Sequence, residues 1–237
     1  MTPAEHTAPP STSAPKPRLS RELVLTTALR LVDEEGLDAL TMRRLGHALG
    51  RDPMSLYRYA ENRAALLDGV TELVFDELEA VPETEDWQLH LRRIAHSLRD
   101  VALRHPNVVP LLVTRPLSTP LGLRPPGTLR PLELILSLLV RAGFAASDAL
   151  HVYRAYYGYL YGHILNELQE FVVDPEESEA LLRLGLHQLP AREFTHLRAL
   201  ADVLIDYDGK AELDEGLTIL LSGLAARLSP QEPTPAA

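Results

Sequence analysis

The stretch LTMRRLGHALGRDPMSLYRYAENR, residues 40–63, predicts two short helices joined by a tight turn. Thr41 is placed to cap the first helix, and Gly50 supplies the left-handed backbone that a sharp helix end needs. Asp52 can cap the second helix, and Pro53 is favoured as its first residue. This layout is typical of a DNA-reading helix-turn-helix. An ordinary two-helix corner with a solvated face is the alternative.

The second helix of the pair presents polar and aromatic side chains. Leu56 is its single obvious core anchor, so the neighbours of Leu56 cannot all be buried with it. Arg58 suits a bidentate contact with guanine, Tyr57 suits phosphate, and a surface ion pair is the alternative for Arg44. The expected DNA contacts are Thr41, Arg43, Arg44, Pro53, Met54, Ser55, Tyr57, Arg58, Tyr59 and Arg63.

The net charge of −10 is divided unevenly along the chain. Residues 1–63 hold 9 lysines and arginines against 8 aspartates and glutamates, whereas the remainder holds 14 against 25. The acidic excess therefore lies outside the motif. There it repels phosphate and can orient docking of the motif on DNA.

The composition limits the classes of protein to which the chain can belong. The 237 residues can bury a sizeable core and allow two domains, and the absence of cysteine excludes disulfides and thiolate metal sites. The ends, 1–17 and 229–237, are rich in proline, serine and threonine and are predicted to be disordered. The longest apolar stretch, 132–140, is far shorter than the roughly 20 residues that span a bilayer. We expect a soluble, cytoplasmic protein without a membrane partner.

Helical periodicity continues throughout the chain between these ends, and no convincing strand appears. Helices are expected over 20–35, 62–80, 87–104, 107–113, 127–142, 147–171, 176–187, 191–205 and 211–228. The predicted fold class is therefore all-α. A three-helix DNA-binding domain over 18–63 would precede a larger ligand-binding and dimerisation domain over 64–228.

Five of the eight tyrosines fall in the helix expected over 147–171. Tyr153, Tyr157 and Tyr161 recur every fourth residue and share one stripe of that helix. Phenol groups in an apolar wall can orient a mostly hydrophobic ligand, so this stripe and His163 are candidate ligand contacts. Packing in the core or at a dimer interface is the alternative. His163 and Glu167 have no third partner at a fixed spacing, so neither a metal nor another cofactor is expected.

Two long helices are candidates for a dimer interface. The helix over 147–171 and the final helix over 211–228 can pair with their copies in a four-helix arrangement. Gly216 and Gly223 permit close crossing there. Packing within one chain is the alternative.

The amino-terminal sequence resembles the TetR family of transcriptional regulators over residues 19–78. The matching segments are Glu34–Leu37, Leu40–Arg43, Leu49–Gly50, Ser55–Tyr57, Asn62–Arg63 and Ala65–Leu67. The resemblance implies a homodimer whose two recognition helices enter successive major grooves of a partly palindromic double-stranded operator. It also implies that a small molecule bound in the carboxy-terminal domain releases the DNA.

The carboxy-terminal half is similar to the tetracycline repressor subgroup of that family. The family positions add candidate pocket residues to the tyrosine stripe, namely Trp87, Leu98, Leu112, Thr114, Leu132 and Leu136. The subgroup's positions for a magnesium–tetracycline complex are matched by Leu111 or Leu112, Gly158 and Asn166. Only Asn166 offers an oxygen to a hard cation, so tetracycline is not the expected ligand.

These observations predict a ligand-responsive DNA-binding regulator, a repressor released by a small hydrophobic or aromatic effector. An activator or dual regulator is the alternative within the same class. An enzyme that uses the tyrosine and histidine helix is the alternative in another class. The sequence offers that enzyme no activated nucleophile, no paired catalytic carboxylates and no complete set of metal ligands.

Overall fold

The structure is a computed structural model that describes residues 18–79, 86–118, 120–170, 184–205 and 207–228. The arms predicted over 1–17 and 229–237 lie outside the described residues, as does the first part of the helix predicted over 176–187. All regular structure in the described ranges is helical, which confirms the all-α class. None of the described helices is long and apolar enough to cross a membrane.

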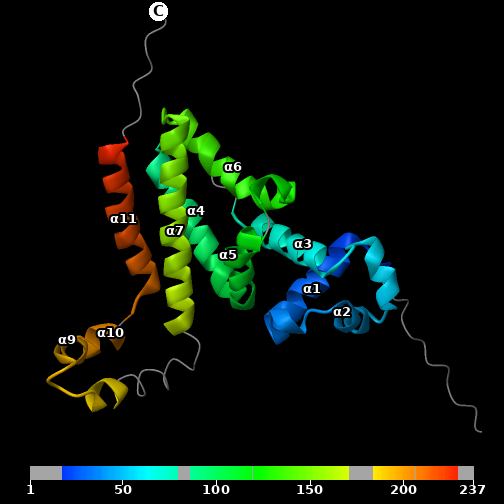
Figure 1. Ribbon diagram of the computed structural model, residues 1–237, viewed down its shortest axis with the longest axis horizontal. Coiled ribbons are helices and arrows are strands. Elements are labelled where there is room, and N and C mark those ends of the chain that lie inside the picture. The colour runs from blue at the N-terminus through cyan, green and yellow to red at the C-terminus, as the bar shows by residue number, and fades with distance from the viewer. Residues whose placement is uncertain (1–17, 80–85, 119, 171–183, 206, 229–237) are drawn as a thin grey trace, which may run out of the picture.

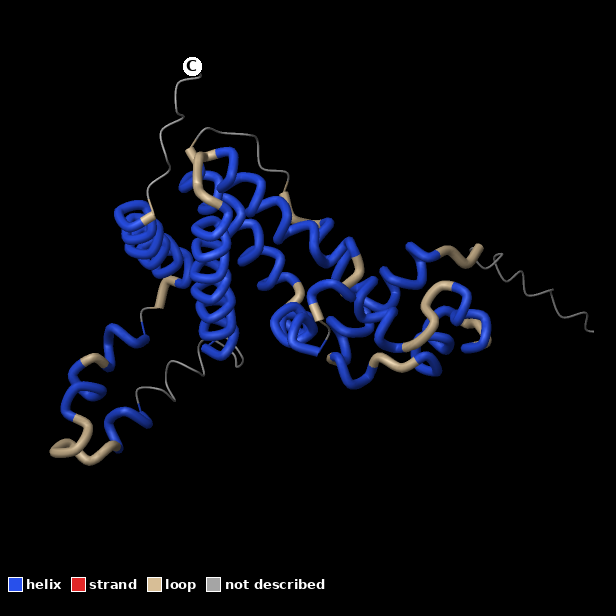
Figure 2. The backbone as a smooth tube through the Cα atoms, turned by 45° about the horizontal axis from the view of Figure 1, so that its top comes forward, coloured by secondary structure: helices blue, strands red, loops and turns tan. Residues whose placement is uncertain are grey.

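The longer helices divide into an amino-terminal bundle and a body (Figure 1). The helices are α1 (Arg21–Glu35), α2 (Met42–Leu49), α3 (Arg63–Asp76), α4 (Trp87–Arg104), α5 (Val109–Ser118), α6 (Pro126–Arg141), α7 (Ala146–Glu170), α9 (Thr195–Ala199), α10 (Ala201–Ile205) and α11 (Gly209–Arg227). Short 3-10 helices cover Leu37–Ala39, Pro53–Arg58, Pro106–Val108 and Leu121–Leu123. Figure 2 shows α9 and α10 apart from the body in a second view.

Local capping explains the ends of the amino-terminal helices. The Ser20 hydroxyl accepts the Leu23 amide at 3.1 Å to start α1, and the Thr41 hydroxyl accepts the Arg44 amide at 3.1 Å to start α2. Gly50 ends α2 with φ 61° and ψ 38°, which confirms the predicted left-handed turn. A Cβ on Gly46 would lie 3.0 Å from the Arg51 carbonyl oxygen, so the turn folds back on this glycine.

Several predicted boundaries differ from the structure. The helix predicted over 62–80 ends at Asp76, and that predicted over 107–113 is a 3-10 turn followed by α5, which reaches Ser118. The helix predicted over 191–205 is divided into α9 and α10 at Leu200. Its sequence, ALADVL, carries no proline or glycine there, so periodicity alone did not predict the break.

Two hydrophobic clusters form the core. The amino-terminal cluster contains Leu31, Leu56 and Val70, and it continues into the end of α4 and the start of α5 through Val101 and Leu111. The second cluster joins α4, α6, α7 and α11. Residues of α3 such as Val70 belong to the first cluster, so α3 shares one close-packed core with the helix-turn-helix.

The helices α7 and α11 run side by side in Figures 1 and 2. Tyr159 of α7 reaches the backbone of α11, and its hydroxyl lies 3.2 Å from the Glu212 carbonyl oxygen. A Cβ on Gly216 would meet that hydroxyl at 1.9 Å, whereas a Cβ on Gly223 would meet nothing within 4 Å. Within the described chain, Gly216 therefore permits packing of α11 on α7, and Gly223 opens outward.

Candidate DNA-reading surface and ligand cavity

The recognition helix is the 3-10 helix Pro53–Arg58 at the edge of the amino-terminal bundle. The Asp52 carboxylate accepts the Met54 amide at 2.8 Å and caps its start. Leu56 is 0% exposed and anchors the helix in the core, as predicted. Met54 is 73% exposed, Tyr57 is 44% exposed and Arg58 is also exposed. A capped and anchored helix thus presents a sulfur, a phenol and a guanidinium to solvent.

Some of the predicted DNA contacts have partners inside the chain. The Tyr59 hydroxyl donates to the Leu19 carbonyl oxygen at 2.9 Å, and the Arg58 guanidinium carbon lies 5.9 Å from the centre of the Tyr59 ring. The Ser55 hydroxyl donates to the Asp52 carbonyl oxygen at 2.6 Å. These contacts fix the recognition helix against the start of α1 and hold Tyr59 half-buried.

Arg44 and Arg63 also make contacts within the bundle. Arg44 forms a two-point ion pair with Glu35, and its guanidinium lowers the pKa of that carboxyl through hydrogen bonding. Arg63 donates to the carbonyl oxygens of Leu40 and Leu37 at 2.9 and 2.8 Å and so closes the turn before α2. This ion pair is the alternative to a DNA contact that the sequence indicates for Arg44.

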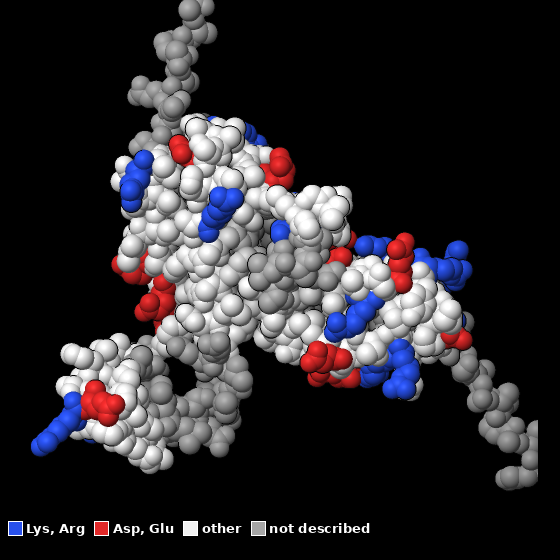
Figure 3. Space-filling view, in the orientation of Figure 1, with Lys and Arg blue, Asp and Glu red and all other residues white. Residues whose placement is uncertain are grey.

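The remaining predicted contacts lie on the surface of the same region. Thr41 and Arg43 at the start of α2 are exposed, and Pro53 is half-buried. Figure 3 shows arginine and acidic side chains close together over the amino-terminal bundle. The bundle therefore offers positive charge at selected points and is not uniformly basic.

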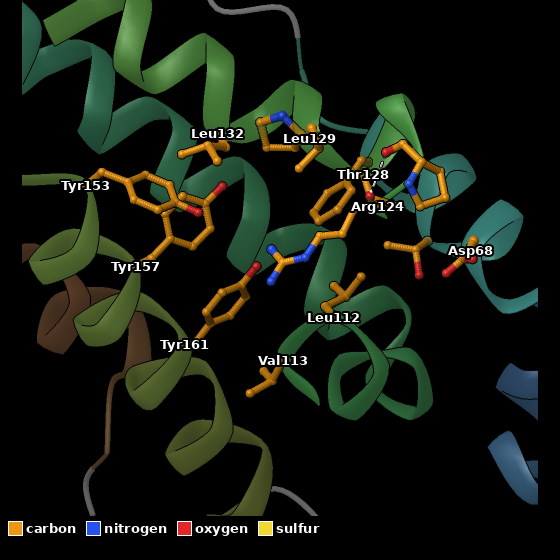
Figure 4. A pocket seen from close by; sticks show the side chains of 14 residues that line it. Asp68, Leu112, Val113, Arg124, Thr128, Leu129, Leu132, Tyr153, Tyr157 and Tyr161 are labelled. Atoms are coloured by element: carbon orange, nitrogen blue, oxygen red, sulfur yellow. Dashed lines mark hydrogen bonds between the residues drawn. The ribbon is translucent and has the colours of Figure 1, made fainter. Parts of the chain in front are cut away.

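A cavity of about 150 Å³ lies between α3, α5, α6 and α7 (Figure 4). Its walls are mostly apolar and aromatic, with one acid and one base. The lining residues are Asp68, Thr71, Phe75, Leu112, Val113, Arg124, Pro125, Thr128, Leu129, Pro131, Leu132, Tyr153, Tyr157 and Tyr161. An apolar cavity with a few convergent polar groups is the usual form of a small-molecule site.

The tyrosine stripe forms one wall of this cavity. The ring of Tyr157 lies 4.7 Å from that of Tyr153 and 5.1 Å from that of Tyr161, centre to centre. Burial raises the pKa of all three phenols, and for Tyr153 the charge of Arg124 partly opposes that rise. The phenols are therefore neutral hydrogen-bonding groups at physiological pH.

The structure brings five of the ten predicted ligand contacts to the cavity: Leu112, Leu132, Tyr153, Tyr157 and Tyr161. Trp87 instead packs edge-on against Phe144 at 5.0 Å between ring centres, and Leu98 is buried in the same core cluster. Leu136 packs against that cluster from outside. These three do not line the cavity. Thr114 belongs to α5, in a stretch whose side chains lie outside the described residues.

His163 also lies away from the cavity lining, on another face of α7. Its ring faces Glu167, with Nε2 3.6 Å from Oε2, and Glu167 is fully buried. Arg99 of α4 donates from Nε to that carboxylate at 2.9 Å and makes a second, bidentate contact through Nη2. His163 therefore lies beside the Arg99–Glu167 ion pair that joins α4 to α7. Among the described residues no cluster of histidine, aspartate and glutamate is arranged to hold a metal ion.

Sequence reasoning missed the polar cavity residues Asp68, Arg124 and Thr128. Asp68, Thr71 and Phe75 are spaced by three and four along α3, so their common face was available as a signal. Arg124 lies in a bend between proline-rich segments, where periodicity gives no direction. Only the tertiary structure turns it toward the tyrosines, as Figure 4 shows.

Contacts through α3 join the cavity to the DNA-reading surface. Glu72 pairs with Arg21 at the start of α1 at 3.0 Å, and a Cβ on Gly127 of α6 would lie 2.2 Å from Oε1 of Glu72. A groove of about 370 Å³ lies on this side, and its lining includes Tyr57, Arg58 and Glu72. Asp68 and Pro125 line both the groove and the cavity. The two features therefore share a wall.

The end of α4 provides a second connection to the amino-terminal bundle. His105 lies between two carboxylates, with Nδ1 2.9 Å from Asp33 of α1 and Nε2 3.2 Å from Glu77, the residue after α3. Asn107 also donates to the Asp33 carbonyl oxygen at 2.9 Å. The body thus contacts the end of α1 and the carboxy-terminal end of α3.

A capped recognition helix, joined through α3 and the end of α4 to a body with a cavity, defines a ligand-responsive DNA-binding regulator. Residues 24–70 match the family described as bacterial regulatory proteins, tetR family. Residues 81–228 match the tetracyclin repressor-like, C-terminal domain. The chain therefore belongs to the TetR family of transcriptional regulators.

Known proteins similar to the chain support this assignment. An HTH-type transcriptional regulator of Saccharopolyspora erythraea is 30% identical over 221 residues, which cover 92% of this chain and 89% of that protein. The class C tetracycline repressor protein of Escherichia coli is 28% identical over 87% of this chain and 91% of that protein. The crystal structure of ActR from Streptomyces coelicolor in complex with actinorhodin superposes with a TM-score of 0.73. That match covers 89% of this chain and 97% of ActR at 29% identity.

Proposed function

We propose that the protein is a cytoplasmic repressor that leaves its operator when a small hydrophobic or aromatic molecule fills the cavity between α3, α5, α6 and α7. The apolar and tyrosine-rich lining supports this class of effector. Similar proteins that are named as repressors support the direction of control. We infer no catalysed reaction, because the cavity places no activated nucleophile or paired carboxylates around a common point.

The proposal divides the chain into a DNA-binding domain over 18–63 and a ligand-binding and dimerisation domain over 64–228. TetR-family regulators act as dimers, and we place the interface on α7 and α11. The side chain of Ile219 on α11 is 68% exposed, and Gly223 lies one turn further along the same helix with open space beside it. An exposed apolar residue beside an open glycine suits close packing of a second helix.

The exposure of each side chain on the recognition helix ranks the proposed DNA contacts. Tyr57, Arg58 and Met54 are the proposed base and phosphate contacts, because they are the most exposed side chains on a fixed helix. Tyr59, Arg44 and Arg63 hold the helix-turn-helix in shape through their contacts with Leu19, Glu35 and Leu40. Thr41, Arg43, Pro53 and Ser55 complete the proposed surface.

The observation that carries the proposal is the position of α3. Four residues separate this helix from the recognition helix, and its residues Thr71 and Phe75 line the cavity. An effector that prefers a different position of α3 would move the recognition helix with it. The ratio of its affinities for the two positions sets the extent of DNA release.

Fluorescence anisotropy with labelled DNA from upstream of the gene and its neighbours tests the DNA-binding part. We expect saturable, salt-sensitive binding by the wild type. Arg58→Ala should weaken it by about tenfold or more, the loss of one base contact worth roughly 1–3 kcal/mol. Arg30→Ala is the matched control, because Arg30 lies on α1 and pairs with Glu34 at 3.1 Å.

Equal loss in the Arg58→Ala and Arg30→Ala variants would remove Arg58 from the reading surface. If no genomic fragment binds, selection from random DNA shows whether the protein binds any DNA sequence. Failure to enrich any sequence would overturn the proposal. A promoter–reporter fusion tests the direction of control. Deletion of the gene should raise reporter output, and a fall would identify an activator.

A further inference from the structure

The cavity has opposite charges at its two ends. Arg124 and Asp68 are the charged side chains in its lining. In Figure 4 the Arg124 guanidinium extends toward Tyr161 and Tyr157, whereas Asp68 lies on the far side, beyond Thr128. A ligand in this space therefore meets a cation beside the tyrosines and a carboxylate at the other end.

We propose that the effector is an aromatic acid, whose carboxylate or acidic phenol binds Arg124 between the tyrosine hydroxyls. The inference rests on the proposed function and specifies the ligand class of the same cavity. It assigns Arg124 as the residue that selects for acidity. It also assigns the tyrosine rings as the surface on which the aromatic part of the ligand packs.

The chemistry of the tyrosine end favours an anion. A guanidinium stays charged at any physiological pH, and its planar fork matches both oxygens of a carboxylate. The phenols of Tyr153, Tyr157 and Tyr161 are neutral and can donate hydrogen bonds to the same group. Because Arg124 is half-buried in an apolar wall, water screens its attraction less than at the surface.

The position of Arg124 relative to Tyr153 agrees with this assignment. Arg124 lies close enough that its charge works against the effect of burial on the pKa of the Tyr153 phenol. The same field acts on any ionisable group of a ligand placed beside Tyr153, and it favours the ionised form of an acid. A ligand amine would be disfavoured at this end of the cavity.

Asp68 sets the orientation of the ligand. A carboxylate repels an acidic group, so the acid of the effector is directed away from α3 and toward α7. The opposite end of the ligand can carry a hydroxyl or an amine, which can donate a hydrogen bond to the Asp68 carboxylate. The cavity therefore discriminates between the two ends of a flat molecule whose rings would otherwise fit in either direction.

Matched neutral and acidic probes test the inference. The probes are 2-naphthoic acid and 2-naphthamide, which share shape and rings and differ in charge. Binding to the full-length protein is measured by isothermal titration calorimetry. We expect the acid to bind at least about tenfold more tightly than the amide, because a hydrogen bond to a charged group outweighs a neutral one.

Three variants assign that preference to one side chain. Arg124→Gln should remove the preference, and Arg124→Lys should keep part of it because the charge remains without the fork. Arg130→Gln is the matched control: Arg130 follows on α6, is 72% exposed and lies outside the cavity lining. It should keep the full preference. Thermal unfolding without probe shows whether each variant is folded. If Arg124→Gln is unfolded, Arg124→Lys alone tests the proposal.

Equal affinity of the wild type for acid and amide would overturn the inference, as would a preference that persists in Arg124→Gln. Failure of both probes to bind would overturn it too. Operator binding by the same samples separates this outcome from failure of the proposed function. A protein that binds DNA but not the probes remains a regulator with another effector class, whereas loss of both activities rejects both proposals.

Discussion

Leu56 and Arg58 lie two residues apart on the recognition helix and have different roles. Leu56 is fully buried and belongs to the amino-terminal core, whereas the Arg58 side chain is exposed above the Tyr59 ring. The stability of the helix-turn-helix and its affinity for DNA therefore depend on different side chains of the same short helix.

Substitution at these two positions separates stability from DNA binding. Leu56→Ala should lower the free energy of unfolding by about 2–5 kcal/mol, because it leaves a cavity in the core. Arg58→Ala should change it by no more than about 0.5 kcal/mol, the usual range for a surface site. Urea unfolding followed by circular dichroism measures both. Similar losses in the two variants would show that Arg58 also supports the fold.

At the level of single residues, the sequence predicted the helix caps of the helix-turn-helix better than the hydrogen-bond partners of its side chains. Thr41, Gly50 and Asp52 act as predicted because capping depends on neighbours within four residues. The partner of Tyr59 is Leu19, which is 40 positions away, and that of Arg63 is the turn before α2. No local pattern predicts such pairs, since they depend on how α1 and α3 pack.

Among the helices, α6 packs against α3 where the cavity meets the amino-terminal bundle. Its first turn lies against Glu72 of α3, and Thr128, one residue after Gly127, lines the cavity. A carboxylate beside a helix amino terminus is stabilised by the exposed amides of that turn. Glu72 therefore contacts the cavity wall on one side and Arg21 of α1 on the other.

Gly127→Ala tests this contact. The added Cβ would meet Glu72, so the carboxylate must move away from α6, and overpacking of this kind costs about 1–3 kcal/mol. We expect lower stability in urea and a change in the effector concentration that releases DNA. Gly122→Ala is the matched control in the preceding 3-10 helix, because a Cβ there meets nothing within 4 Å. Identical behaviour of the two variants would show that the Glu72 contact is not part of the coupling.

The sequence predicted most of the helices and only part of the cavity. Amphipathic spacing identified α1, α4, α6, α7 and α11 within a few residues, because each buries a continuous apolar stripe. The tyrosine stripe was visible for the same reason. Trp87, Leu98 and Leu136 lie outside the cavity lining, since a family position does not say whether a buried residue faces a neighbour or a void.

For the whole molecule, the tyrosine-rich core makes stability sensitive to alkali. Burial raises the pKa of Tyr153, Tyr156, Tyr157 and Tyr161 in the folded state. Above the ordinary tyrosine pKa of about 10 the unfolded chain releases these protons while the folded chain keeps them. The stability that these groups contribute is thus complete below pH 10 and is lost as the pH rises through their folded values.

Urea unfolding between pH 8 and 11 measures this effect, and tyrosinate absorbance reports the ionisation directly. We expect the free energy of unfolding to fall above pH 10, with less of the fall in Tyr157→Phe. Phenylalanine is the matched replacement because it keeps the ring contacts with Tyr153 and Tyr161 and removes the proton. A stability curve that stays flat to pH 11 would show that these phenols are accessible to solvent in the folded protein.

The cavity volume has a consequence for the choice of compounds that control the protein. At about 150 Å³ the space equals an engineered protein cavity known to hold benzene, whereas drug-sized ligands occupy about 300–1,000 Å³. We therefore expect a molecule with several rings to push the walls apart, and in the proposed mechanism that displacement moves α3. A single-ring acid would fit without strain and leave the DNA-bound form intact. Such a compound would act as an antagonist and raise the amount of effector needed for induction.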